Sequence, residues 1–321
     1  MTPYSKENTV LSGADLPQGE RLGTKPLISV CICTYKRPLL LRRLLKALAV
    51  QATDDLFTYA IVVVDNDHLH SASSVVSDFR ATSNLRVTYR VEARQNIALA
   101  RNMAVTNADG EFVAFIDDDE FPTTNWLLTL YEACTMSNVD GVLGPVKPHF
   151  DVTPPSWVVR GKFYERETYP TGLVIDWRKG RTGNVLLRKG LFVDCTHPFN
   201  PTFRNGEDQE FFYRMIENGH VFIWCNQAVV YEVIPPARWR TAFMLRRALL
   251  RGAIEPQTPT FGIRDIAKSI VAVAAYTLAL PFVSMFGQSA FMSLLVRLCD
   301  HLGKLLAVIG LNPINDPYVT E

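Results

Sequence analysis

The chain has 321 residues, a formal net charge of +1, 48% hydrophobic residues and 20% charged residues. This length accommodates one large α/β domain with an appendage. A charge balance near zero gives no global reason to expect nucleic-acid binding. The six cysteines form no CxxC pair and no spacing suited to zinc, which favours reduced, buried thiols.

Composition divides the chain into three parts. Residues 1–25 are polar and lack the basic start and apolar centre of a signal peptide, so we expect a flexible tail there. Residues 26–235 are predicted to form one domain, and residues 236–321 a basic and apolar helical region.

Short apolar runs alternate with helical periodicity in residues 26–235. Such alternation with nearly all-apolar strands is typical of a mostly parallel sheet covered by helices on both faces. The first half has predicted strands at 27–34, 60–64, 85–90 and 112–116, and predicted helices at 37–51, 96–108 and 126–136. The second half has predicted strands at 139–143, 185–187, 221–224 and 228–231, a helix at 207–218, and a proline-rich functional loop at 145–170.

Polar residues end three of these strands. Thr34, Asp65 and the run Asp117-Asp118-Asp119 each follow an apolar run directly. Because ligands bind beyond the carboxyl ends of strands in open α/β sheets, we expect these side chains to share a binding site.

The sequence Asp117-Asp118-Asp119-Glu120 places four acidic groups in a row. They repel one another, and a bound cation would relieve that repulsion. Oxygen ligands of this kind suit Mg²⁺ or Mn²⁺ together with substrate phosphates. A solvated acidic turn is the alternative interpretation.

A second acidic pair, Glu207-Asp208, opens the predicted helix 207–218 after Gly206. Carboxylates at a helix N-terminus are favoured by its exposed N–H groups, so capping explains the pair without any function. The functional alternative is a general base that takes a proton from an acceptor hydroxyl. The sequence contains no GxxxxGK[ST], GxGxxG, HExxH or GxSxG motif, which disfavours NTPase, dinucleotide-binding, zinc-protease and serine-hydrolase functions.

Six segments of the chain together carry a family resemblance. They are SVCICTYKRP (29–38), IVVVDN (61–66), ARQNIALARNMA (93–104), FVAFIDDDEFP (112–122), TGNVLLR (182–188) and GEDQEFFYRM (206–215). In this order they resemble the inverting glycosyltransferases of family 2, which have the GT-A fold. Within that family the likeness is to bacterial exopolysaccharide glucosyltransferases of the succinoglycan-biosynthesis type, which have a similar E-x-x-P-x-x-R segment, here Glu232 to Arg238.

The resemblance implies a Rossmann-like, mixed and mostly parallel sheet, and a role for each matching residue. Asp208 would be the catalytic base, and Glu207 would support the acceptor side. Asp117 and Asp119 would form the D-x-D pair. The residues implied for the nucleotide-sugar site are Thr34, Tyr35, Arg37, Asp65, Arg101, Asp117, Asp118, Gly183 and Asn184.

The resemblance also implies Mg²⁺ or Mn²⁺ as cofactor and inversion at the anomeric carbon. Asp119 would bind the metal ion. Many relatives supply a late histidine as a further ligand, whereas this chain has Tyr231-Glu232 in that region. Either Glu232 takes that place, or the site uses only Asp119 and the diphosphate.

The C-terminal region places an arginine-rich stretch before an uncharged segment at 269–286, interrupted by Pro281. A further apolar stretch at 291–309 is amphipathic. The segment 269–286 could cross a membrane, lie on anionic lipid, or pack on its own domain. Arginines beside an apolar helix favour the cytoplasmic leaflet, so we expect the cytoplasmic face of the inner membrane.

The partners expected from the resemblance are a UDP-sugar donor, with glucose favoured, and a polyprenyl-diphosphate-linked oligosaccharide acceptor. Two alternatives remain open from the sequence. A nucleotidyltransferase also uses aspartates at the edge of a parallel sheet, but it usually has a glycine-rich loop after its first strand. A catalytically silent sugar-nucleotide-binding subunit would not need the intact acidic pairs.

Overall fold

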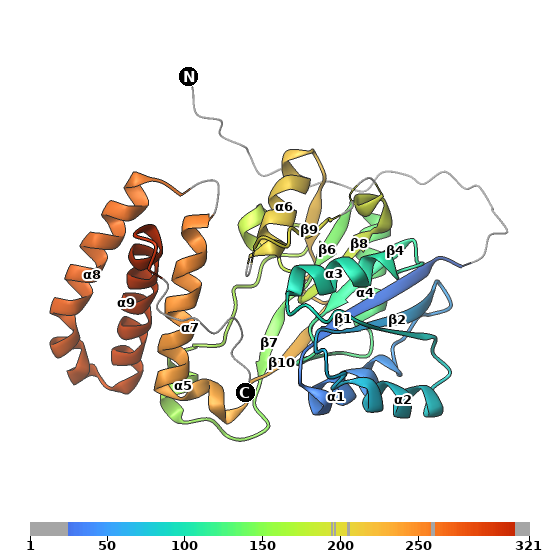
Figure 1. The fold of residues 1–321 in the computed structure, drawn as a ribbon, viewed down its shortest axis with the longest axis horizontal. Helices are drawn as coiled ribbons and strands as arrows, with labels where there is room; N and C mark the ends of the chain where they lie inside the picture. Colours follow the sequence, from blue (N-terminus) through green and yellow to red (C-terminus); the bar gives the residue numbers. More distant parts are fainter. Residues whose placement is uncertain (1–24, 194, 196, 204–205, 258–260, 312–321) are drawn as a thin grey trace.

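The structure is a computed structural model that describes residues 25–193, 195, 197–203, 206–257 and 261–311 (Figure 1). Nearly all of the expected tail at 1–25 therefore lies outside the described residues, as does the end of the C-terminal region at 312–321.

The larger sheet has the strand order β3-β2-β1-β4-β8-β6-β9. All neighbouring strands pair in parallel except β8, which is antiparallel to both β4 and β6. The expectation of a mixed, mostly parallel sheet is thus confirmed. The strands are β1 (Leu27–Thr34), β2 (Thr58–Asp65), β3 (Val87–Val91), β4 (Phe112–Ile116), β6 (Gly141–Leu143), β8 (Asn184–Arg188) and β9 (Phe222–Trp224).

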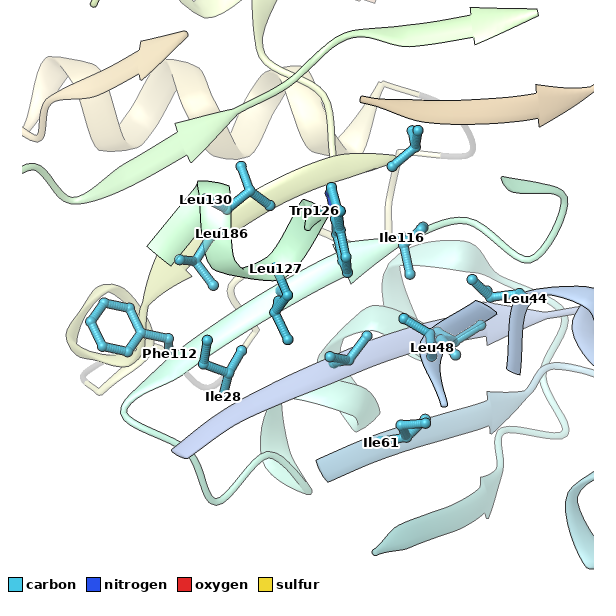
Figure 2. Packing of buried hydrophobic residues seen from close by; sticks show 14 of the residues in the cluster. Ile28, Leu44, Leu48, Ile61, Phe112, Ile116, Trp126, Leu127, Leu130 and Leu186 are labelled. Carbon is cyan, nitrogen blue, oxygen red and sulfur yellow. The ribbon is translucent and has the colours of Figure 1, made fainter. Parts of the chain in front are cut away.

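Side chains of β1 alternate between two apolar layers, as the period of a strand requires. Ile28, Val30 and Ile32 face one cluster, and Cys31 faces the other. The first layer is covered by α1 (Pro38–Leu48), α2 (Ser73–Thr82) and α4 (Trp126–Met136), and Figure 2 shows its packing. The second layer is covered by α3 (Ile97–Thr106) and α6 (Glu207–Glu217).

The helix α1 shows why its sequence folds this way. Proline occupies its first turn, where a missing N–H costs nothing. Four leucines recur on one face and are fully buried against the sheet: Leu41, Leu44, Leu45 and Leu48. Burying each leucine contributes about 2 kcal/mol, which fixes the helix beside the carboxyl end of β1.

A smaller sheet lies beside the acidic run. Its central strand β10 (Val230–Val233) pairs antiparallel with β5 (Glu120–Pro122) and parallel with β7 (Val146–His149). The sequence predicted only a loop across 145–170, but β7 and the short helix α5 (Ser156–Arg160) form within it. Pro145 precedes β7 and Pro148 lies within it, and these prolines hid its short strand pattern.

Three long helices complete the described chain: α7 (Thr241–Ile254), α8 (Ile263–Val283) and α9 (Gln288–Val308). Figure 1 shows them side by side, with α9 packed against both α7 and α8. Pro281 does not interrupt α8: it lies in the last turn, and the helix ends two residues later, at Val283. By length and composition, the segment Ile263–Phe286 is the one candidate for a membrane span among the described residues.

Candidate active site

A cavity of about 550 Å³ opens at the carboxyl edge of the larger sheet. It is bounded by the ends of β1 and β4, the start of α6, the strand β10 and the helix α7. Ten of the residues predicted for the site line it: Thr34, Tyr35, Arg37, Arg101, Asp117, Asp118, Asp119, Glu207, Asp208 and Glu232.

Asp118 is buried and holds two neighbours at the end of β1. The Thr34 hydroxyl donates to Oδ2 at 2.8 Å, and Arg37 Nη1 donates to Oδ1 at 3.0 Å. Burial raises the pKa of Asp118 to about 6, against the opposing charge of Arg37. The side chain therefore ties β1 to the acidic turn.

Asp119 and Glu232 are joined by one guanidinium. Arg238 donates to Asp119 Oδ2 at 2.6 Å and to Glu232 Oε1 at 2.7 Å. Arg37 also reaches Asp119, at 3.2 Å, and Arg166 donates to Glu232 Oε2 at 2.5 Å. Burial opposes ionisation of Asp119, but Arg238 and Arg37 outweigh it and hold the pKa of that carboxyl below its usual value.

The fit of this pair to a divalent cation follows from its chemistry. No group of three acidic, histidine or cysteine side chains within the described ranges is arranged to hold a metal ion. Asp119 and Glu232 nevertheless present two carboxylates to the same guanidinium, and Mg²⁺ typically takes one or two carboxylates plus substrate phosphates. The carboxylate oxygens of Asp119 and Glu232 are therefore suitable ligands for such an ion, provided that Arg238 releases them.

A second buried ion pair lies across the cavity. Arg101 donates to Glu207 Oε1 and lies 3.6 Å from Asp117 Oδ1. Arg101 and Glu207 are both buried, at 7% and 4% exposure. Removing either partner would leave an uncompensated buried charge, so this pair fixes the start of α6 relative to the acidic turn.

Asp208 lies in the first turn of α6 and lines the cavity. The turn begins at Gly206, whose φ of 84° lies in the left-handed region that glycine adopts without strain. The N–H of Gln209 donates to Asp208 Oδ1 at 2.8 Å. The other carboxylate oxygen has no partner in the described part of the chain, so the residue retains a free basic oxygen at the cavity.

Glu120 is the last residue of the acidic run, and its side chain is buried. Burial, and next Asp117, raise the pKa of Glu120 well above its usual value. Its Oε2 accepts from the Asp117 N–H at 3.2 Å, whereas its buried Oε1 has no hydrogen-bond partner among the described residues. A Cβ on Gly183 would lie 2.9 Å from that Oε1, so the glycine makes room for the carboxyl.

Three of the predicted site residues do not line the cavity. Asp65 is fully buried, and its carboxylate accepts from Ala72 N at 2.7 Å and from the Tyr89 hydroxyl at 2.9 Å. Asn184 is buried at the start of β8, and Gly183 lies behind the acidic turn. These three residues support the cavity wall from inside the protein.

Several cavity residues were not predicted for the site from the sequence. Asn66 follows β2, Arg166 comes from the predicted loop 145–170, and Phe243 and Arg247 come from α7. Arg238 was noted only as part of a sequence motif. The sequence around Arg166 does not indicate that this side chain pairs with Glu232, because the two residues are 66 positions apart in the chain.

The fold and the cavity define a glycosyltransferase of the GT-A type. The family model of Glycosyl transferase family 2 matches residues 29–206, and the chain belongs to that family. The matched part ends at the start of α6, so the second half of the cavity, including β10 and α7, lies beyond it.

Curated and solved proteins agree with this assignment. The chain is 29% identical over 299 residues to the succinoglycan biosynthesis protein ExoM of Rhizobium meliloti (strain 1021), covering 89% of this chain and 94% of ExoM. The mannosyltransferase PcManGT from Pyrobaculum calidifontis, solved with GDP-Man and Mn²⁺, has a TM-score of 0.59 at 18% identity, covering 88% of this chain and 87% of PcManGT. S. aureus TarS 1-349 with UDP-GlcNAc has a TM-score of 0.50 at 21% identity, covering 70% and 65%. At these identities the structural likeness shows the fold alone.

Proposed function

We propose that this glycosyltransferase moves one sugar, with inversion, from a UDP-sugar to a polyprenyl-diphosphate-linked oligosaccharide in bacterial exopolysaccharide synthesis. The name of the relative ExoM supports the place in exopolysaccharide synthesis. The UDP-GlcNAc complex of TarS is compatible with a uridine nucleotide on this fold. The resemblance to exopolysaccharide glucosyltransferases favours glucose as the sugar.

One observation carries the proposal. The acidic turn that would face the donor and the carboxylate that would serve as base lie on the walls of a single cavity. Asp117 and Glu207 are joined through Arg101, which sets the two walls at a fixed separation. This arrangement suits direct displacement between two substrates bound side by side.

The proposed reaction uses Asp208 as general base. Its free carboxylate oxygen takes the proton of an acceptor hydroxyl as the hydroxyl oxygen forms a bond to the anomeric carbon. The bond from that carbon to the diphosphate oxygen breaks at the opposite side, and the electron pair leaves with the nucleoside diphosphate. One displacement inverts the centre, so an α-linked donor gives a β-glycoside.

The proposed cofactor is Mg²⁺ or Mn²⁺, held by Asp119 and Glu232. When bound, it would supply positive charge for the departing diphosphate. Arg37, Arg166 and Arg238 already pair with these carboxylates and so keep the site organised before the ion and donor bind.

We also propose attachment to the cytoplasmic face of the inner membrane through α8. The segment Ile263–Phe286 contains α8, and only 6% of its most apolar part is buried within the protein. It exposes large apolar side chains such as Leu278, Phe282 and Phe286. An exposed apolar surface of this kind marks an interaction site. A lipid-linked acceptor would make such attachment useful.

The test is the variant Asp208→Asn, which keeps the size of the side chain but removes its basicity. Loss of a general base lowers turnover by about 10²- to 10⁴-fold, and donor binding should be kept. Glu217→Gln, an exposed change at the other end of α6, is the matched control. Release of UDP and binding of UDP would be measured for both variants. Full activity of Asp208→Asn would refute its role as base.

A further inference from the structure

The helix α7 presents one face to the active-site cavity. Its lining residues recur at intervals of three and four, as the period of a helix requires. They are Phe243, Arg247, Leu250, Arg251 and Ile254. This face lies outside the part of the chain that the family model matches.

The opposite side of α7 packs on α9 at backbone contact. A Cβ on Gly252 would lie 2.0 Å from the carbonyl oxygen of Asp300, and one on Gly303 would lie 2.2 Å from that of Leu249. Arg251 also donates to Asp300 at 2.8 Å. The C-terminal helices therefore hold the cavity-facing side of α7 in a defined position.

Six arginines line the cavity, and five of them form ion pairs. Arg37, Arg101, Arg166, Arg238 and Arg251 each have at least one carboxylate partner. Arg247 is different: no carboxylate of the described residues lies within ion-pair distance of it. Arg247 lines the cavity, so its guanidinium is available to an anionic ligand that binds there.

The charged neighbours that act on Arg247 are one carboxylate, Glu232, and two guanidinium groups, those of Arg238 and Arg166. The nearby Glu232 is already shared by Arg166 and Arg238, and Arg238 is shared in turn with Asp119. Partial desolvation by the cavity walls, and the charges of Arg238 and Arg166, lower the pKa of Arg247 despite the attraction of Glu232. Two further negative charges at this position would relieve the repulsion between guanidinium groups.

We propose that Arg247 binds the diphosphate of the nucleotide sugar. Guanidinium groups bind phosphate oxygens through paired, charge-assisted hydrogen bonds. The position is next to Glu232 and Arg238, where the donor diphosphate must lie if Asp119 and Glu232 hold the cation. The C-terminal helices would then complete the donor site as well as attach the protein to lipid. This inference rests on the proposed function.

The test compares the affinities of UDP and uridine for the full-length protein in detergent, by isothermal titration calorimetry. Losing a charged hydrogen-bond partner should weaken UDP binding by about 10- to 100-fold in Arg247→Gln. Uridine lacks the phosphates, so its affinity should not change, and this also shows that the variant is folded. Arg240→Gln is the control, because Arg240 is exposed, precedes α7 and does not line the cavity.

Each outcome is decisive. A selective loss of UDP affinity in Arg247→Gln, absent from Arg240→Gln, supports the phosphate role. Unchanged UDP affinity, or an equal loss for UDP and uridine, overturns that role and leaves the proposed function standing. If the wild-type protein does not bind UDP, the proposed function itself fails.

Discussion

Replacing Asn184 by alanine is expected to destabilise the fold strongly while leaving donor affinity intact. The side chain is buried at the start of β8 and makes three hydrogen bonds. Its Oδ1 accepts from Trp126 Nε1 at 2.7 Å, and its Nδ2 donates to the carbonyl oxygens of Ala228 at 2.7 Å and Pro145 at 3.1 Å. These contacts join α4 to the segments that lead into β7 and β10.

The magnitude follows from the three groups that would lose their partner. Each unsatisfied buried polar group costs about 1–3 kcal/mol, so the substitution should lower the free energy of unfolding by about 3–9 kcal/mol. Water that enters the vacated space would replace some of these bonds, which favours the lower end of that range. Because Asn184 does not line the cavity, the effect on UDP binding should be indirect.

Urea denaturation of the detergent-solubilised protein measures the loss, and calorimetry at a low temperature measures UDP affinity. Asn226→Ala, a change at an exposed residue, is the control. A loss below about 1 kcal/mol, within the range of ordinary substitutions, together with weaker UDP binding would refute the structural role. It would place Asn184 in the donor site, as the sequence resemblance implied.

Three further predictions concern the acidic turn. The raised pKa of Glu120 means that the unfolded state loses its proton first as pH rises, so this carboxyl makes wild-type stability decline above the usual glutamate pKa. Glu120→Gln should therefore show a shallower decline than the wild type in urea titrations between about pH 5 and about pH 8, because Asp118, whose pKa is also raised, still contributes. Gly183→Ala brings a Cβ to 3.0 Å from Asp117 Oδ2, so it should abolish sugar transfer and lower the free energy of unfolding by about 1–3 kcal/mol. Gly190→Ala is the control, because open space surrounds Gly190, and it should change neither transfer activity nor stability. Chelation by EDTA should stop UDP release, and Asp119→Asn should raise the Mn²⁺ concentration needed to restore it; activity that is indifferent to EDTA would contradict the metal proposal.

Local pattern was sufficient to predict the sheet and one wall of the cavity. Thr34 and Asp117 each follow an apolar run, and parallel strands bring such ends to one edge. For Asp208, local pattern left helix capping and a general base as alternatives, and the family resemblance favoured the base. These features depend on residues close together in the chain.

Contacts between distant segments could not be predicted in this way. Arg238 lies 119 residues from Asp119, and no local periodicity indicates that they meet. Asp65 satisfied the same strand-end rule as Thr34, yet its carboxylate turns inward to Ala72 and Tyr89. The role of α7 as a cavity wall depends on its packing against α9, which only the tertiary structure shows.

The most direct test of the proposed function is transfer from an α-linked, isotope-labelled UDP-glucose to a lipid-linked oligosaccharide by the detergent-solubilised protein with Mn²⁺. Mass spectrometry would detect the extended acceptor, and NMR would assign the configuration of the new linkage. The account predicts stoichiometric UDP release and a β-linked product. An α-linked product, or no transfer from any UDP-sugar to acceptors of this class, would contradict it.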